Sequence, residues 1–149
     1  MGKTRLNILF WSIYDIELLT QDGFYSQGRL PLRLKITYLR DFTADSLVEQ
    51  TSKEWRALGI TTPKTIRWMA ALQSIWPDVS EQDSLELHVD CDSVSRFYFN
   101  GMLVGTIADK QFAPAFVAIW LSRKTSQPEM RRELLANKTI LSDEQSVCS

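Results

Sequence analysis

The sequence has few of the residues that most often carry chemistry. It holds one histidine, His88, and two cysteines, Cys91 and Cys148, which lie far apart. No CxxC or Cys/His spacing predicts a metal site. There is no G-x-S-x-G motif, and the six glycines are isolated turn residues that form no phosphate-binding loop. These patterns predict no catalytic residue, no metal and no cofactor, and they allow a disulfide between the two cysteines without requiring one.

The chain also lacks an excess of charge of either sign and any long apolar run. Its net charge of −1 gives no electrostatic basis for binding nucleic acid or an anionic membrane. No apolar run approaches the roughly 18 residues of a membrane span. Met1-Gly2-Lys3 leads directly into a strand pattern. The residues themselves therefore leave open a cytoplasmic protein and an exported one whose leader has been removed.

What is present is the composition of one globular domain. The 149 residues are 44% hydrophobic and 23% charged. A chain of this length buries about 68–70% of its unfolded surface, so it needs no metal or disulfide to fold. We expect a single domain over residues 1–137 and a flexible, polar C-terminal tail over 138–149.

Periodicity predicts the order of the elements. Two-residue alternation predicts strands near 4–19, 32–39, 84–90, 94–99 and 102–107. Apolar stripes with a 3.6-residue period predict helices near 43–58, 62–76, 109–121 and 127–135. Asn100-Gly101 is the strongest hairpin signal, because a type I′ turn needs positive φ at both residues. Grouped strands with short turns indicate an α+β domain, with an antiparallel sheet and helices on one face.

Two arginines are candidate ligand-binding residues. Arg40 follows the apolar run Ile36–Leu39, and Arg96 is followed by Phe97 and Tyr98. A guanidinium in such a place could bind a carboxylate through two hydrogen bonds at the end of an apolar pocket. The alternative is that each arginine pairs with a nearby acidic side chain. His88 falls on the polar face of its strand and is not expected to be catalytic.

Four segments carry a resemblance to a known family. They are Leu9-Phe10-Trp11 through Tyr14-Asp15, Thr37-Tyr38-Leu39-Arg40-Asp41, Arg96-Phe97-Tyr98 through Asn100-Gly101 and Gly105, and Phe112 through Trp120-Leu121. In this order they resemble the chalcone isomerase superfamily, and most closely its bacterial chalcone-isomerase-like branch, from about Arg5 to Leu135. The resemblance implies an open-faced β-sandwich, an antiparallel sheet with a helical layer on one face. It also implies an exported, periplasmic protein, with a cytoplasmic location as the alternative.

The same resemblance argues against the activity for which the family is named. The plant enzymes use an arginine from an upstream strand that this chain does not supply, together with five cleft residues. Our alignment by eye places Trp11 at the first threonine position. It places Thr43, Ser46 and Gln50 near the tyrosine, lysine and asparagine positions, and Ile119 near the last hydroxyl. The tyrosine and lysine that would bind the substrate ketone are therefore missing.

We expect a non-catalytic domain that binds a small hydrophobic ligand, such as a fatty acid, between the sheet and the helix at 109–121. The expected walls are Trp11, Trp68, Phe116, Ile119 and Trp120. The expected carboxylate receptors are Arg40 or Arg96, with Tyr38 or Tyr98, and Arg40 is the first choice. Two alternatives remain: an intramolecular lyase or isomerase with a rebuilt site, and a structural or interaction domain whose close-packed core leaves no cavity. The sequence names no protein partner.

Overall fold

The computed structural model describes residues 3–8, 11–20 and 30–136. The strands in these ranges are β1 (Lys3–Ile8), β2 (Trp11–Thr20), β3 (Leu32–Tyr38), β4 (Ser84–Val89), β5 (Ser95–Phe99) and β6 (Met102–Ile107). The helices are α1 (Ala44–Ala57), α2 (Pro63–Ile75), α3 (Phe112–Leu121) and α4 (Pro128–Ala136). Among the described residues, none of the helices combines the length and the hydrophobicity that a membrane span requires.

The strands form one antiparallel sheet in sequential order, β1-β2-β3-β4-β5-β6. This confirms the predicted fold class. One prediction is wrong: the single strand expected over 4–19 is a hairpin of two strands, in which Leu6 lies opposite Tyr14. Pairing within the hairpin places these two residues on the same face, so the alternation of apolar residues continues across the chain reversal and resembles one long strand.

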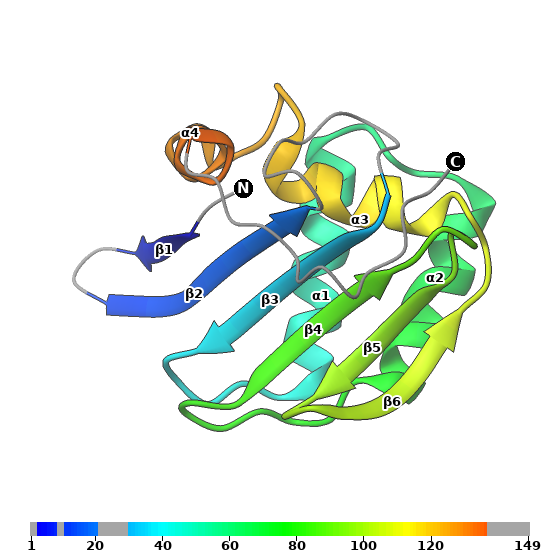
Figure 1. Ribbon diagram of the computed structural model, residues 1–149, viewed down its shortest axis with the longest axis horizontal. Coiled ribbons are helices and arrows are strands. Elements are labelled where there is room, and N and C mark those ends of the chain that lie inside the picture. The colour runs from blue at the N-terminus through cyan, green and yellow to red at the C-terminus, as the bar shows by residue number, and fades with distance from the viewer. Residues whose placement is uncertain (1–2, 9–10, 21–29, 137–149) are drawn as a thin grey trace.

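The helices cover one face of the sheet, as Figure 1 shows, with α1, α2 and α3 behind the strands and α4 beside β1. Strand β3 illustrates why: its alternate residues are buried beneath the helices. Those residues are Leu32, Leu34, Ile36 and Tyr38. We call the side of the sheet that these residues and the helices share the inner face. Helix α3 is buried along most of its length, so it lies between the sheet and α1.

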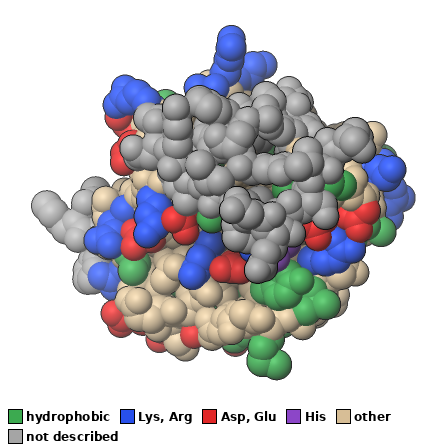
Figure 2. Space-filling model, viewed as in Figure 1, with side chains coloured by type: hydrophobic (Ala, Val, Ile, Leu, Met, Phe, Trp, Pro, Cys, Tyr) green, Lys and Arg blue, Asp and Glu red, His purple; other side chains and the backbone are tan. Residues whose placement is uncertain are grey.

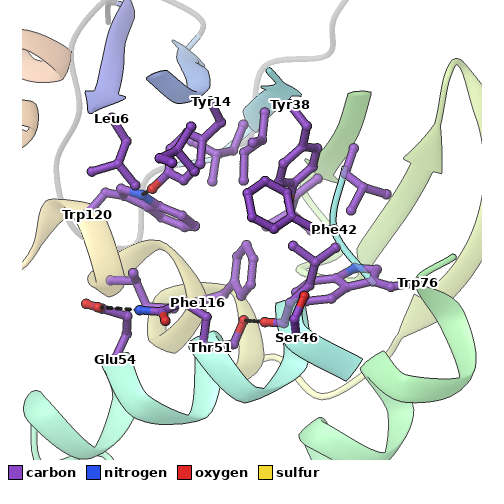
Figure 3. Close-up of a pocket in the computed structure, with 18 of the residues that line it drawn as sticks. Leu6, Tyr14, Tyr38, Phe42, Ser46, Thr51, Glu54, Trp76, Phe116 and Trp120 are labelled. Atoms are coloured by element: carbon purple, nitrogen blue, oxygen red, sulfur yellow. Dashed lines mark hydrogen bonds between the residues drawn. The ribbon is translucent and has the colours of Figure 1, made fainter. Parts of the chain in front are cut away.

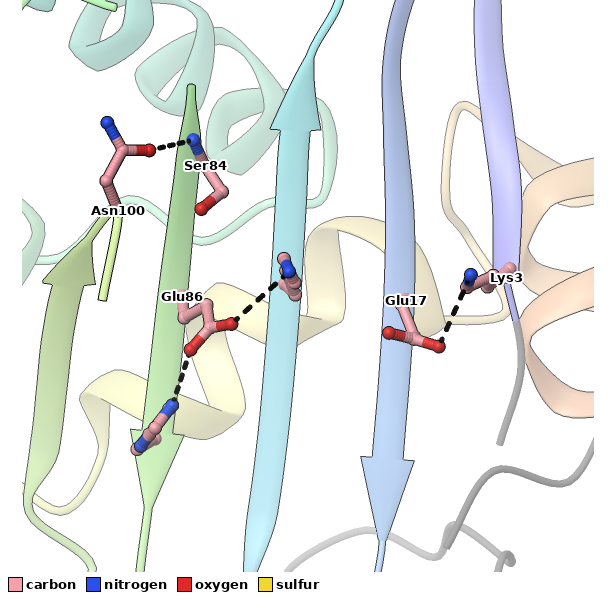
Figure 4. Close-up of polar contacts among 7 residues, drawn as sticks. Lys3, Glu17, Ser84, Glu86 and Asn100 are labelled. Carbon is pink, nitrogen blue, oxygen red and sulfur yellow. Dashed lines mark hydrogen bonds and ion pairs between the residues drawn. The ribbon is translucent and has the colours of Figure 1, made fainter. Parts of the chain in front are cut away.

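The outer face of the sheet carries charged side chains. Figure 2 shows Lys, Arg, Asp and Glu side chains interspersed over it. In Figure 4, Glu86 accepts from His88 Nε2 at 2.9 Å and lies 3.8 Å from Lys35 Nζ. Lys3 and Glu17 form a further pair at 3.9 Å. The His88 and Glu86 side chains are only 16% and 26% exposed, so this pair is partly buried, whereas Lys3 at 74% is largely in solvent.

The Asn100-Gly101 turn has the backbone conformation that the sequence predicts. Asn100 and Gly101 have φ of 48° and 86°, as a type I′ turn requires. Asn100 also accepts a hydrogen bond from the Ser84 amide through its side-chain oxygen (Figure 4).

Gly105 on β6 lies against Ile75 at the end of α2, where an added Cβ would come within 2.5 Å of Ile75 Cγ1. Glycine therefore allows α2 to approach the sheet edge closely.

Candidate functional site

An apolar cavity of about 310 Å³ lies between the inner face of the sheet and the helices (Figure 3). Its volume is at the lower end of the range for small-molecule sites, which is about 300–1,000 Å³. Its lining consists of Leu6, Ile13, Tyr14, Leu34, Ile36, Tyr38, Phe42, Ser46, Leu47, Gln50, Thr51, Glu54, Trp76, Leu85, Leu87, Phe97, Phe116, Ile119, Trp120 and Gln127. A hydrophobic core without a cavity, one of the expected alternatives, is therefore not what the structure shows.

The walls of the cavity are apolar because the strands turn alternate residues toward the helices. β3 supplies Leu34 and Ile36, and β4 supplies Leu85 and Leu87. Phe116, Ile119 and Trp120 of α3 form the opposite side, as three- and four-residue spacing on one helix face allows. These walls favour an apolar ligand.

The polar residues of the lining gather along α1 and before α4. Ser46, Gln50 and Glu54 are spaced by four residues on α1, are at least partly exposed, and so lie on one side of that helix. Glu54 Oε1 accepts from Gln50 Nε2 at 3.1 Å, and Glu54 Oε2 accepts from Ser126 Oγ at 2.7 Å. Because these residues are more exposed than the walls, we take them as the rim through which a ligand would enter.

Two tyrosines bring hydroxyl groups to the sheet side of the cavity. In Figure 3, Tyr14 and Tyr38 project from the strands toward the helices. Their rings meet edge to face, with centroids 6.2 Å apart. Burial raises the pKa of Tyr14 to about 12, and the hydrogen bond from Trp120 partly opposes this rise. Burial also raises the pKa of Tyr38 well above its usual range. Both hydroxyls are therefore protonated, and able to donate, at neutral pH.

A third donor in the lining is the indole of Trp76. Its Nε1 is buried without a hydrogen-bond partner among the described residues. Its ring packs edge to face against Phe97 and Phe116, at 5.6 Å and 5.9 Å. The polar groups buried with these walls are thus hydrogen-bond donors, a set that suits a ligand carrying an acceptor.

Four of the predicted site residues line this cavity. They are Tyr38, Phe116, Ile119 and Trp120. Trp68 does not: it packs in the core against Trp55 and Phe112, with centroids 5.6 Å and 5.7 Å away. Its indole donates to Asp109 at 3.2 Å. The side chain of Trp11, which begins β2, lies outside the part of the chain that the structure describes.

Of the four predicted carboxylate receptors, only Tyr38 lines the cavity. Arg96 and Tyr98 point to the outer face, because they alternate with the buried Phe97 on β5. Arg96 pairs instead with Asp92, at 2.7 Å, and Tyr98 packs against His88 with ring centroids 4.2 Å apart. Arg40 is exposed beyond the end of β3 and is absent from the lining. Arg96 therefore follows the alternative prediction, in which the arginine pairs with a nearby acidic side chain of the protein.

Sequence reasoning missed several lining residues. Tyr14 could have been found, since it lies on the same face as the buried Ile16 and Leu18. Phe42 and Trp76 lie in segments next to helix ends, where no periodicity predicts which way a side chain points. Ser46, Gln50 and Ile119, aligned by eye with cleft positions of the plant enzymes, do line the cavity.

Among the described residues, no group of three or more His, Cys, Asp or Glu side chains is placed to hold a metal ion. His88 lies on the outer face, away from the cavity. Cys91 is disulfide-bonded. Cys148, the partner that the sequence allows without requiring, lies outside the described residues.

Comparison with known proteins gives three findings. The model of the chalcone isomerase-like family matches residues 17–136. An uncharacterized protein of Haemophilus influenzae is 25% identical over 123 residues, which cover 83% of this chain and 60% of that protein. The chain thus spans about 60% of this relative's length. A fatty-acid binding protein of Arabidopsis thaliana has a similar fold, with a TM-score of 0.59 and 10% identity over 90% of this chain and 83% of that one.

Proposed function

Because this chain belongs to the chalcone isomerase-like family, we propose that it binds a small hydrophobic ligand with an acyl chain in the cavity between sheet and helices, without catalysing a reaction. The observation that carries the proposal is the cavity itself, whose walls are aliphatic and aromatic. The similar fold of a protein described as a fatty-acid binding protein supports the choice of ligand class.

The polar groups of the cavity support binding over catalysis. Among the described lining residues Glu54 is the only acidic or basic side chain of the Asp, Glu, Lys, Arg and His types, and both of its oxygens already accept hydrogen bonds. Ser46 and Gln50 stand where our alignment expects the lysine and asparagine of the plant enzymes. A cyclisation that develops negative charge on oxygen needs groups placed to stabilise that charge. We expect no chalcone cyclisation above the solvent rate.

Titration with Nile red, an uncharged dye that fluoresces in apolar surroundings, tests the proposal. We expect a saturable rise in fluorescence at a stoichiometry of one. Leu47→Trp would place a large side chain in the cavity from the partly exposed face of α1 and should abolish the rise. Glu49→Trp, on an exposed part of the same helix away from the cavity, is the matched control and should bind as the wild type does.

Two results would contradict the proposal. One is the lack of saturable binding by the wild-type protein. The other is equal binding by the folded Leu47→Trp and Glu49→Trp variants. Native mass spectrometry of gently purified protein adds an independent readout, because a bound lipid would appear as a discrete mass increment that Leu47→Trp removes.

We also propose that the domain works in an oxidising, periplasmic compartment. The disulfide at Cys91 supports this, because disulfides persist in such compartments and are rare in the cytosol. Cells quenched with acid and treated with an alkylating reagent should yield the Cys91 peptide unlabelled unless a reductant is added first. A Cys91 peptide that is fully alkylated without reductant would contradict the proposal.

A further inference from the structure

We propose that the cavity selects ligands whose polar end is an uncharged hydrogen-bond acceptor, such as the carbonyl of an acyl ester, and disfavours a free carboxylate. The inference rests on the proposed function, since it specifies the ligand class of the same cavity. It departs from the expectation that an arginine receives a fatty-acid carboxylate.

The buried hydroxyls are placed to donate. Trp120 Nε1 donates to the Tyr14 hydroxyl oxygen at 2.8 Å, which leaves the proton of that hydroxyl available to an acceptor. Trp76 Nε1 in the same lining is buried without a hydrogen-bond partner among the described residues, and Tyr38, only 5% exposed, brings a second hydroxyl to the lining. A buried polar group without a partner is costly, so a ligand acceptor that reaches Trp76 Nε1 would be favoured.

The described lining of the cavity supplies no positive charge, because it contains no lysine, arginine or histidine. Lys53 on α1 pairs with Glu49, and Arg131 on α4 donates to the Leu121 carbonyl at 2.9 Å. A carboxylate entering the cavity would lose its hydration without gaining an ion pair, and the burial of an unpaired charge is strongly unfavourable.

Negative charge is already present at the cavity. The Glu54 carboxylate contributes to the raised pKa of Tyr14, which means that its field acts at the Tyr14 hydroxyl. A ligand carboxylate bound at that hydroxyl would be repelled by the negative charge of Glu54. A neutral carbonyl oxygen carries no net charge and would not be repelled in this way.

The first turn of α1, which could otherwise attract an anion, is already occupied. The Ala44 amide donates to Asp78 Oδ1 at 2.7 Å, and the Ser46 amide donates to Thr43 Oγ1 at 3.1 Å. A helix N-terminus binds anions through unsatisfied amides. Here a carboxylate of the protein itself takes that place, so the turn offers little to a ligand anion.

Competition against Nile red tests the inference with ligands of one chain length. At about pH 8, methyl decanoate should displace the dye at a concentration at least roughly tenfold lower than decanoate. The difference should narrow at about pH 5, where part of the acid is protonated and neutral. Decane, which has no hydrogen-bond acceptor, measures the contribution of apolar contacts to binding.

Two variants assign the effect to named groups. Tyr38→Phe should weaken methyl decanoate roughly two- to tenfold, the range expected for one hydrogen bond, and leave decane unchanged. Glu54→Gln should strengthen the binding of decanoate more than that of methyl decanoate, because only decanoate is an anion. Equal displacement by decanoate and its ester at about pH 8 would overturn the inference and leave the proposed function standing. Failure of Nile red to bind the wild type would overturn both.

Discussion

The indole Nε1 of Trp120 donates a hydrogen bond of 2.8 Å to the hydroxyl of Tyr14, joining α3 to β2 across the cavity lining. In apolar surroundings, breaking such a bond leaves two polar groups unpaired, and this costs more free energy than it would in water. It holds the Trp120 ring against the wall and fixes the Tyr14 hydroxyl oxygen in place. The cavity is therefore bordered by a side-chain pair whose positions depend on each other.

This pairing predicts non-additive effects of substitution. Trp120→Phe leaves the Tyr14 hydroxyl without its donor, and Tyr14→Phe leaves the Trp120 N–H without its acceptor. Each should lower the free energy of unfolding by roughly 1–3 kcal/mol. The double variant should cost less than the sum, because neither group is then left unpaired. Urea denaturation of the four proteins measures this difference, and strictly additive effects would show that the bond contributes nothing.

Stability should fall at alkaline pH through the buried tyrosines. The folded-state pKa of Tyr14 is raised to about 12, above the ordinary value of 10.0, so the fold favours its protonated form. Its contribution is complete below the unfolded pKa and is lost as pH rises from about 10 toward about 12. The expected slope is up to about 1.4 kcal/mol per pH unit for each such group.

Urea denaturation at several pH values between about 9 and 12 measures that slope. Tyr14→Phe and Tyr38→Phe should each make it shallower, since burial raises the pKa of Tyr38 in the same direction. An unchanged slope in both variants would show that these hydroxyls do not link folding to pH.

Gly105→Ala should destabilise the protein by roughly 1–3 kcal/mol, because the added methyl group would overlap Ile75. Thermal or urea denaturation measures the loss. Val104→Ala, on the same strand at a position that is 37% exposed, is the control and should have a smaller effect. Adding Ile75→Ala to Gly105→Ala should restore part of the loss. If it restores none, the close approach of α2 is not the cause.

Two aromatic residues, both expected from the sequence to form walls, should differ in their effect on ligand binding. Phe116→Trp enlarges a side chain that lines the cavity and should weaken Nile red binding at least roughly tenfold. Trp68→Phe changes a core residue outside the lining and should alter binding less than about twofold. Circular dichroism confirms that both variants are folded. Equal weakening by the two would contradict the cavity as the binding site.

Local patterns account for most of the elements. Alternating residues predicted β3, β4, β5 and β6 to within a residue or so, and the Asn100-Gly101 turn followed from its positive φ requirement. The start of α3 was less well predicted: the helix was expected from residue 109 and begins at Phe112. Asp109 lies in the turn before that helix and accepts from the Gln111 amide. Ser126, which precedes α4, donates to Glu54. Short polar side chains have several partners within reach, and tertiary contacts select among them.

Alternation by itself determined the inner and outer faces of the strands. It was enough to place Tyr38 inward and, applied strictly, to place Arg96 outward with Glu86 and His88. Which inward side chains pack together and which border a cavity was decided only by the tertiary structure. Trp68 and Trp76 are both buried, yet Trp68 fills a cluster with Trp55 whereas Trp76 borders the cavity. Periodicity describes one element at a time, whereas an empty volume depends on how side chains from several elements meet and on the space they leave.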